Sequence, residues 1–225
     1  MSAPEAFGGF RRAAFEWFSE LERDNSKRFF EAHRDAYERD VRGPLEIMLE
    51  ELTNEFDGRV KMFRQHRDIR FSKDKSPYKT ATYGLIADRP GSDAGLYAQL
   101  TAAGLFAGTG YYRLSPDQLE RYRERAAGRA GAGLERMLNR LVADGFTLMG
   151  DELRTVPRGY PRDHPRAAVL RRRAVAGGRR LKAPKGRGIS RDRALAHVRE
   201  TWRALVPLNR WLDRNVGAAE VEPGR

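Results

Sequence analysis

The chain has 225 residues, 40% of them hydrophobic, which is enough to bury the core of one large domain or two small ones. It contains no Cys, and this excludes disulfides, thiolate zinc sites, iron–sulfur clusters and a Cys nucleophile. Its formal net charge of +12 favours an anionic partner, because a positive field speeds the encounter with phosphates. We expect a single domain over residues 1–225, with an ordered core from about residue 10 to residue 214.

The N-terminal residues have no cationic region that leads into an apolar run. Elsewhere no uninterrupted apolar run approaches the length of a membrane-spanning helix, about eighteen residues. We therefore expect a cytoplasmic protein that has no membrane partner.

The first quarter of the chain shows the periodicity of amphipathic helices. Aromatic and aliphatic residues recur at spacings of three and four, and they predict a helix over residues 10–23. A second helix is predicted over residues 26–40, with a cap near Ser26. A third begins at Gly43-Pro44, since Pro suits the first helical position.

From Val60 the apolar period shortens from 3.6 to 2, which predicts strands. The predicted strands cover residues 60–64, 69–72, 80–87, 96–101, 104–107 and 111–114. The run Gly108-Thr109-Gly110 is predicted to be the turn between the last two. Such short connections favour an antiparallel meander, because a parallel pair needs a crossover of about a dozen residues.

The C-terminal half returns to helical patterns. Ser115-Pro116-Asp117-Gln118 has the residues of a capping box, and the helix after it should run to about Ala127. Further elements are predicted over residues 133–143 (helix), 146–149 (strand), from Pro165 (short helix) and over 179–182 (short strand).

A long helix with a continuous apolar face is predicted to begin near Ser190. Pro207 should kink it and Gly217 should end it, while the final eight residues should fray. The pattern as a whole predicts the α+β class: N-terminal helices and a long C-terminal helix packed on a mostly antiparallel, curved sheet.

The densest group of chemically versatile side chains lies between Phe63 and Thr80. Its candidate ligands for an anion are Arg64, Arg67, Arg70, Lys73, Lys75, Lys79 and the Tyr78 hydroxyl. A strand, a turn and a returning strand could bring them together on the charged face of the sheet. Arg offers phosphate or carboxylate a bidentate fork, and Lys offers a point charge. The segment therefore predicts a site for a phosphorylated or other anionic small molecule, with a nucleotide as one option.

His66 and Asp68 are the candidate catalytic residues in this segment. His66 could act as an acid or base beside a bound anion, and Asp68 could orient the cations or take a proton. The four His residues show none of the close metal-binding spacings, so no metal site is predicted. The sequence leaves the cofactor, the oligomeric state and the presence of enzymatic activity open.

The run Phe-Arg-x-x-Arg-Asp-Ile-Arg-Phe-Ser-Lys-Asp-Lys-Ser-Pro-Tyr-Lys-Thr, residues 63–80, resembles the signature of an uncharacterised bacterial family, domain of unknown function 2461. Segments 21–30 and 157–165 are similar to other recurrent segments of that family, and the similarity extends from about residue 10 to residue 212. The resemblance implies one compact α+β domain. It implies no particular activity.

Two other interpretations stay open. In the first, the chain is a non-enzymatic nucleic-acid-binding protein that uses a broad Arg-rich surface, including residues 171–173, 179–180, Lys185 and Arg187, with Tyr residues as stacking surfaces. The candidates for stacking are Tyr78, Tyr83, Tyr111 and Tyr112. In the second, the motif is purely structural and its cations pair internally with Asp68 and Asp74.

Overall fold

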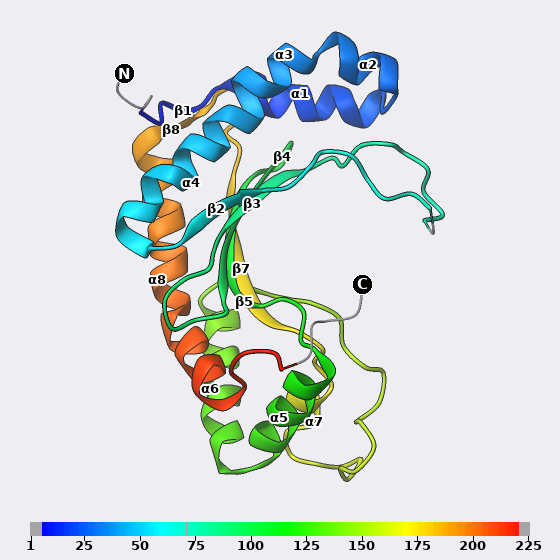
Figure 1. Ribbon diagram of the computed structural model, residues 1–225, viewed down its shortest axis with the longest axis vertical. Coiled ribbons are helices and arrows are strands. Elements are labelled where there is room, and N and C mark those ends of the chain that lie inside the picture. Colours follow the sequence, from blue (N-terminus) through cyan, green and yellow to red (C-terminus); the bar gives the residue numbers. More distant parts are fainter. Residues whose placement is uncertain (1–5, 71, 221–225) are drawn as a thin grey trace. The chain divides into compact units, whose positions relative to one another are not determined.

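The computed structural model describes residues 6–70 and 72–220 (Figure 1). The described residues form one open, six-stranded antiparallel sheet in the order β2-β3-β4-β5-β7-β6. Its strands are β2 (Arg59–Met62), β3 (Thr82–Ala87), β4 (Gly95–Thr101), β5 (Gly104–Tyr111), β6 (Thr147–Met149) and β7 (Val175–Lys182). A separate two-stranded pair consists of β1 (Gly9–Phe10) and β8 (Ile189–Ser190).

Helices precede the sheet, follow β5 and close the chain. They are α1 (Arg12–Arg23), α2 (Lys27–Ala32), α3 (Arg34–Tyr37), the π-helical turn η1 (Glu38–Arg42), α4 (Gly43–Phe56), α5 (Pro116–Ala127), α6 (Arg129–Ala143), α7 (Ala167–Leu170) and α8 (Arg191–Asn215). The predicted α+β class, with its antiparallel sheet and long C-terminal helix, is confirmed. Over residues 6–70 and 72–220, no helix combines the length and the apolar character needed to cross a membrane.

Contacts within the chain divide it into two compact units that are interleaved in sequence. The first unit comprises the described residues up to Ala87 together with Tyr97–Ala107 and Arg180–Glu200. The second comprises Asp88–Leu96, Gly108–Arg179 and the residues from Thr201 onward. β4, β5, β7 and α8 each contribute residues to both units. The single domain expected from the sequence stays a prediction.

In the first unit α4 packs against β2 and β3 (Figure 1). A Cβ atom placed on Gly84 of β3 would lie 2.7 Å from Cδ1 of Leu49 on α4, so the glycine allows this close approach. Buried and partly exposed residues alternate along β3 and β4. The sheet of this unit therefore has one face covered by α4 and one face that is partly open.

In the second unit helices α5 to α8 enclose an apolar cluster that includes the fully buried Tyr122. The hydroxyl of Tyr122 donates to the carbonyl oxygen of Val169 at 2.8 Å. The capping box predicted at the start of α5 is present: the Ser115 hydroxyl accepts from the Gln118 N–H, and the Gln118 side chain accepts from the Ser115 N–H. This prediction is confirmed. A sequence can predict the motif because each side chain bonds the backbone N–H of the other residue within one turn.

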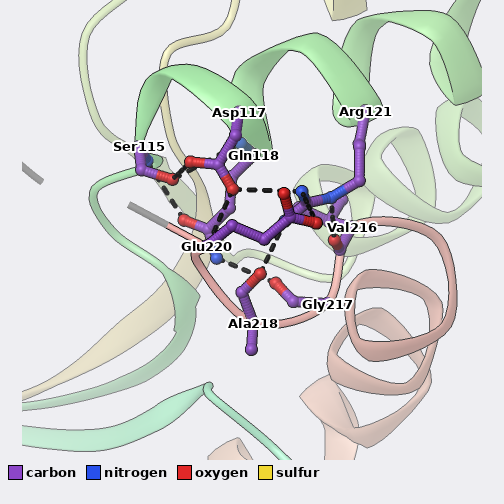
Figure 2. A network of polar contacts seen from close by, with 8 residues as sticks. All are labelled: Ser115, Asp117, Gln118, Arg121, Val216, Gly217, Ala218 and Glu220. Carbon is purple, nitrogen blue, oxygen red and sulfur yellow. Dashed lines mark hydrogen bonds and ion pairs between the residues drawn. The ribbon is translucent and has the colours of Figure 1, made fainter. Parts of the chain in front are cut away.

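The segment after α8 is held against α5 in the second unit (Figure 2). Arg121 donates to the carbonyl oxygens of Val216 and Ala218, each at 2.6 Å. The Glu220 N–H donates to Asp117 at 2.9 Å, and this bond, together with one from the Ser115 hydroxyl, holds the pKa of Asp117 well below its usual range. Fraying of the final eight residues is thus wrong for residues 218–220; the rest of that prediction lies outside the described residues.

Two local predictions, one of a strand and one of a turn, are wrong. Residues 69, 70 and 72 form no strand, and Phe71 lies outside the described residues. The predicted turn at Gly108-Thr109-Gly110 is the middle of one continuous strand, β5. Gly110 has φ +133°, and a Cβ atom there would lie 2.5 Å from Cα of Ala176 on β7. The glycine allows the close approach of two strands. In a sequence, such a glycine cannot be distinguished from a glycine of a turn.

The predicted helix over residues 26–40 is also divided. It breaks at His33 between α2 and α3, and it then continues through η1 directly into α4. A Cβ atom on Gly43 would lie 2.7 Å from the Glu38 carbonyl oxygen, so glycine lets the wider π turn close there. The start of α4 at Gly43-Pro44 is as predicted.

Candidate functional site

Residues 63–70 and 72–80 belong to a long loop between β2 and β3, called the hairpin loop below (Figure 1). Its base continues the strand pairing with three backbone bonds: the Phe63 N–H to the Tyr83 carbonyl (3.1 Å), the Lys79 N–H to the Gln65 carbonyl (3.0 Å) and the Arg67 N–H to the Pro77 carbonyl (2.9 Å). Beyond these bonds the chain has no regular structure over the described residues.

Gln65 is the central residue at the base of the hairpin loop. Its side chain is buried, and its carbonyl oxygen accepts from the Tyr37 hydroxyl at 3.2 Å and from the Thr82 hydroxyl at 2.9 Å. Its amide group donates to the Lys79 carbonyl. Burial raises the pKa of Tyr37 to about 12. Sequence reasoning missed Gln65; an uncharged amide amid so many charged residues was the available signal.

A second anchor comes from the connection between α1 and α2. The side chain of Asn25 accepts from the Tyr78 N–H at 3.0 Å and donates to the Tyr78 carbonyl at 3.1 Å. The Tyr78 ring stacks on Phe30 with 4.1 Å between centroids and an interplanar angle of 12°. Tyr78, predicted as a ligand through its hydroxyl, is only 2% exposed, and this favours a role in packing.

Two of the predicted ligand cations are paired with carboxylates of the hairpin loop itself. Arg70 binds Asp68 in a bidentate manner, with Nε at 2.9 Å and Nη2 at 2.7 Å from the carboxylate oxygens. This bond lowers the pKa of Asp68 to about 2. Arg67 binds Asp74, whose pKa Ser76 and Arg67 together hold well below its usual range. The internal pairing that the sequence left open is therefore present for these two Arg residues.

The other predicted cations meet carbonyl groups or solvent. Lys75 donates to the Ile69 carbonyl at 3.0 Å, and Lys79 donates to the Arg64 carbonyl at 2.7 Å. Within the described residues, the exposed side chains of Arg64 and Lys73 make neither a hydrogen bond nor an ion pair. The contacts thus bind the cations one by one along the loop and do not gather them into a single cluster.

His66 and Asp68 lie on the hairpin loop without bonding to each other among the residues that the structure describes. The His66 ring lies 4.8 Å from the Tyr78 ring and 6.1 Å from the Phe30 ring. Asp68 is engaged by Arg70, and its lowered pKa makes it a weak base near neutral pH. In the same described part of the chain, no group of three or more His, Asp or Glu could hold a metal ion.

A row of aromatic side chains crosses the partly open face of the sheet in the first unit. The aromatic row consists of Phe63, Tyr83 on β3, Tyr97 on β4 and Phe106 on β5. Successive ring centroids lie 4.9, 5.6 and 6.3 Å apart. Of these four residues the sequence singled out only Tyr83, because strand neighbours so distant in the chain cannot be paired from one sequence.

Cations lie over three rings of the aromatic row. Lys61 Nζ is 5.7 Å from the centroid of Phe63, Lys79 Nζ is 4.7 Å from that of Tyr83, and Arg180 Cζ is 5.6 Å from that of Phe106. Lys79 belongs to both features, since it also caps the Arg64 carbonyl in the hairpin loop. It joins the predicted cationic segment to the aromatic row.

The fold and site define an α+β protein whose open antiparallel sheet carries aromatic rings and cations on its partly open face. The chain belongs to the family described as conserved hypothetical protein (DUF2461), which matches residues 13–211. The resemblance seen in the sequence is thereby confirmed. None of the curated proteins compared with the chain matches it.

Proposed function

We propose that the chain binds a phosphorylated small molecule, such as a nucleotide, on the surface formed by the hairpin loop and the partly open face of β2 and β3. The observation that carries the proposal is the position of Lys79. Its ammonium is held by the Arg64 carbonyl and the Tyr83 ring, and it meets no carboxylate among the described residues. A cation fixed in this way keeps its charge for a ligand.

The contacts support a division of roles among the predicted ligands. Arg67 and Arg70 are neutralised by Asp74 and Asp68, so we assign to them the shaping of the loop. We assign contact with the phosphate to Lys79 and to the exposed Arg64 and Lys73. Lys75, tied to the Ile69 carbonyl, has donors left for the same ligand.

Neither candidate catalytic residue of the hairpin loop is suited to general base catalysis by its contacts. A general base works best when its pKa lies near the working pH, and Asp68, with its pKa lowered to about 2, does not meet that condition. His66 packs its ring near Tyr78. No catalytic step is assigned to either residue.

Isothermal titration calorimetry with pyrophosphate and with a nucleoside monophosphate tests the proposal. Lys79→Met keeps the length of the side chain and removes the charge, so the affinity should fall about tenfold, the size expected for one hydrogen bond to a charged group. Lys27→Met is the matched control, because Lys27 is an exposed residue of α2 paired with Glu31 at 3.6 Å. Absence of any phosphate binding, or equal affinities of the native chain and Lys79→Met, would overturn the proposal.

A further inference from the structure

The aromatic row is continuous across four neighbouring segments of the first unit. The register pairs Met62 with Gly84, which places Phe63 opposite Tyr83, and the bond from the Phe63 N–H to the Tyr83 carbonyl follows that register. Opposite residues of antiparallel strands present their side chains on the same face. The ring contacts of Tyr97 with Tyr83 and with Phe106 carry the row onto β4 and β5.

Three of the four residues of the row retain accessible surface on the face away from α4. Gly84, next to Tyr83 on β3, is the residue that approaches Leu49 of α4, so Tyr83 points to the other side. Phe63, Tyr83 and Tyr97 are partly exposed, whereas Phe106 is only 7% exposed. The first two ring pairs are tilted by 37° and 41°, so the rings do not cover each other by parallel stacking.

The charges along the row are all positive. Lys61, Lys79 and Arg180 lie over its rings, and within the described residues none of these three cations pairs with a carboxylate. Arg180 is oriented by a bond to the Thr101 hydroxyl at 3.0 Å. A row of rings, three of which each have beside them a cation without a carboxylate partner in the described part of the chain, complements a ligand that combines planar rings with phosphates.

We infer that the aromatic row binds a short single strand of nucleic acid. Unpaired bases stack on Phe63, Tyr83 and Tyr97, while Lys61, Lys79 and Arg180 contact the phosphates. A strand fits better than one nucleotide because three partly exposed rings extend over more than one base and cations lie along the whole row. The inference deepens the proposed function and rests on it for the phosphate contact of Lys79. A duplex is disfavoured, because its bases already stack on each other.

Fluorescence anisotropy with a labelled oligothymidylate, an oligouridylate of equal length and the corresponding duplex tests the inference. Tyr83→Leu and Tyr97→Leu should each weaken single-strand binding by about 5- to 150-fold, the range that stacking of one base on an aromatic side chain contributes. Tyr83→Phe and Tyr97→Phe keep the rings and should bind like the native chain. Tyr112→Leu is the matched control, because Tyr112 is 67% exposed and lies outside the row.

The salt dependence of binding gives a second readout. It tests the cations of the row without a change to its rings. Three phosphate contacts predict a slope of about −2 for the logarithm of the binding constant against the logarithm of salt concentration. Lys61→Met or Arg180→Gln should each reduce the slope by about 0.7. A slope that neither variant changes would overturn the assigned phosphate contacts.

The outcomes separate the inference from the proposed function. Equal binding of duplex and single strand, with no effect of the Leu variants, would overturn the inference and leave a non-specific basic surface. A mononucleotide that binds as tightly as the oligonucleotide would also overturn it, while pyrophosphate binding that depends on Lys79 would keep the proposed function. Conversely, ring-dependent binding of the oligonucleotide together with no effect of Lys79→Met would support base stacking on the row, but it would overturn the phosphate contact of Lys79 and with it the proposed function. Preference for the thymidylate or the uridylate oligomer distinguishes DNA from RNA.

Discussion

The hairpin loop and the aromatic row both carry cations, but the partners of these cations differ. In the loop, Arg70 pairs with a carboxylate two residues away and Arg67 with one seven residues away. In the row, Lys61 and Arg180 lie over rings and meet no carboxylate among the described residues. Arg67 and Arg70 are thus neutralised by carboxylates close to them in sequence, whereas the cations over the row have no carboxylate partner among the described residues.

The charged tip and the buried base of the hairpin loop differ in what they contribute to its stability. Its ion pairs are exposed, and pairs of this kind contribute little to stability. Its base is buried: Gln65 is 6% exposed and Tyr78 is 2% exposed, with Phe30 stacked on the tyrosine. We expect the buried base, and not the charged tip, to account for the stability of this region.

The largest effect should follow the removal of Phe30. Phe30→Ala opens a cavity between α2 and the loop and should lower the free energy of unfolding by about 3–5 kcal/mol, as measured by urea denaturation. Phe29→Ala is the control, because Phe29 is partly exposed and stacks on His33 with 4.2 Å between centroids. Equal losses for the two variants would show that the buried cluster does not anchor the loop.

A smaller effect, with a dependence on pH, is expected at Tyr37. Tyr37→Phe removes the hydrogen bond to Gln65 and should cost about 1 kcal/mol at neutral pH. The pKa of Tyr37 is raised to about 12, above the value of about 10 in the unfolded chain. Its contribution is therefore fully present below pH 10 and is lost as the pH rises through 12.

Urea denaturation of the native chain and of Tyr37→Phe at neutral pH and above pH 10 checks this prediction. The native chain should lose stability faster than the variant as the pH rises, because the other tyrosines are the same in both proteins and cancel in the comparison. A difference between the two proteins that stays constant with pH would contradict the burial of an un-ionised Tyr37 at the base of the loop.

The smallest effect on stability should come from Arg70. Arg70→Gln should leave the urea midpoint unchanged, because the pair with Asp68 is exposed. The same variant should raise the pKa of Asp68 from about 2 toward the ordinary value of about 3.9, which an NMR titration can follow. A large fall in the midpoint would show that the charged tip stabilises the loop and would reverse the comparison.

Local rules predicted much of the fold. The cap at Ser115, the start of α4 at Gly43-Pro44 and the long final helix with Gly217 after it all depend on neighbours within a turn or two. Gly217 takes φ +67°, a conformation that glycine adopts without strain. The turn expected at Gly108–Gly110 was wrong because Gly110 allows the close approach of β7, more than sixty residues later in the chain.

The candidate site divides in the same way. The sequence located the cationic segment and raised the pairing of Asp68 with Arg70, since both residues lie on one short stretch. It predicted a gathering of cations that the contacts do not show, and it placed Tyr78 among the ligands although Phe30 and Asn25 hold that residue in the interior. The partners of Tyr78 come from α2 and from the connection before it, about fifty residues earlier in the chain.

By itself the sequence determined the α+β class, several helix ends and the residue types of the segment that forms the hairpin loop. These features depend on periodicity, on caps and on residue types, all of which act over a few positions. Only the tertiary structure decided which cations have a carboxylate partner and which rings contact each other across the strands. Those properties depend on distances of a few ångströms between strands far apart in the chain, and the order of strands in the sheet sets these distances.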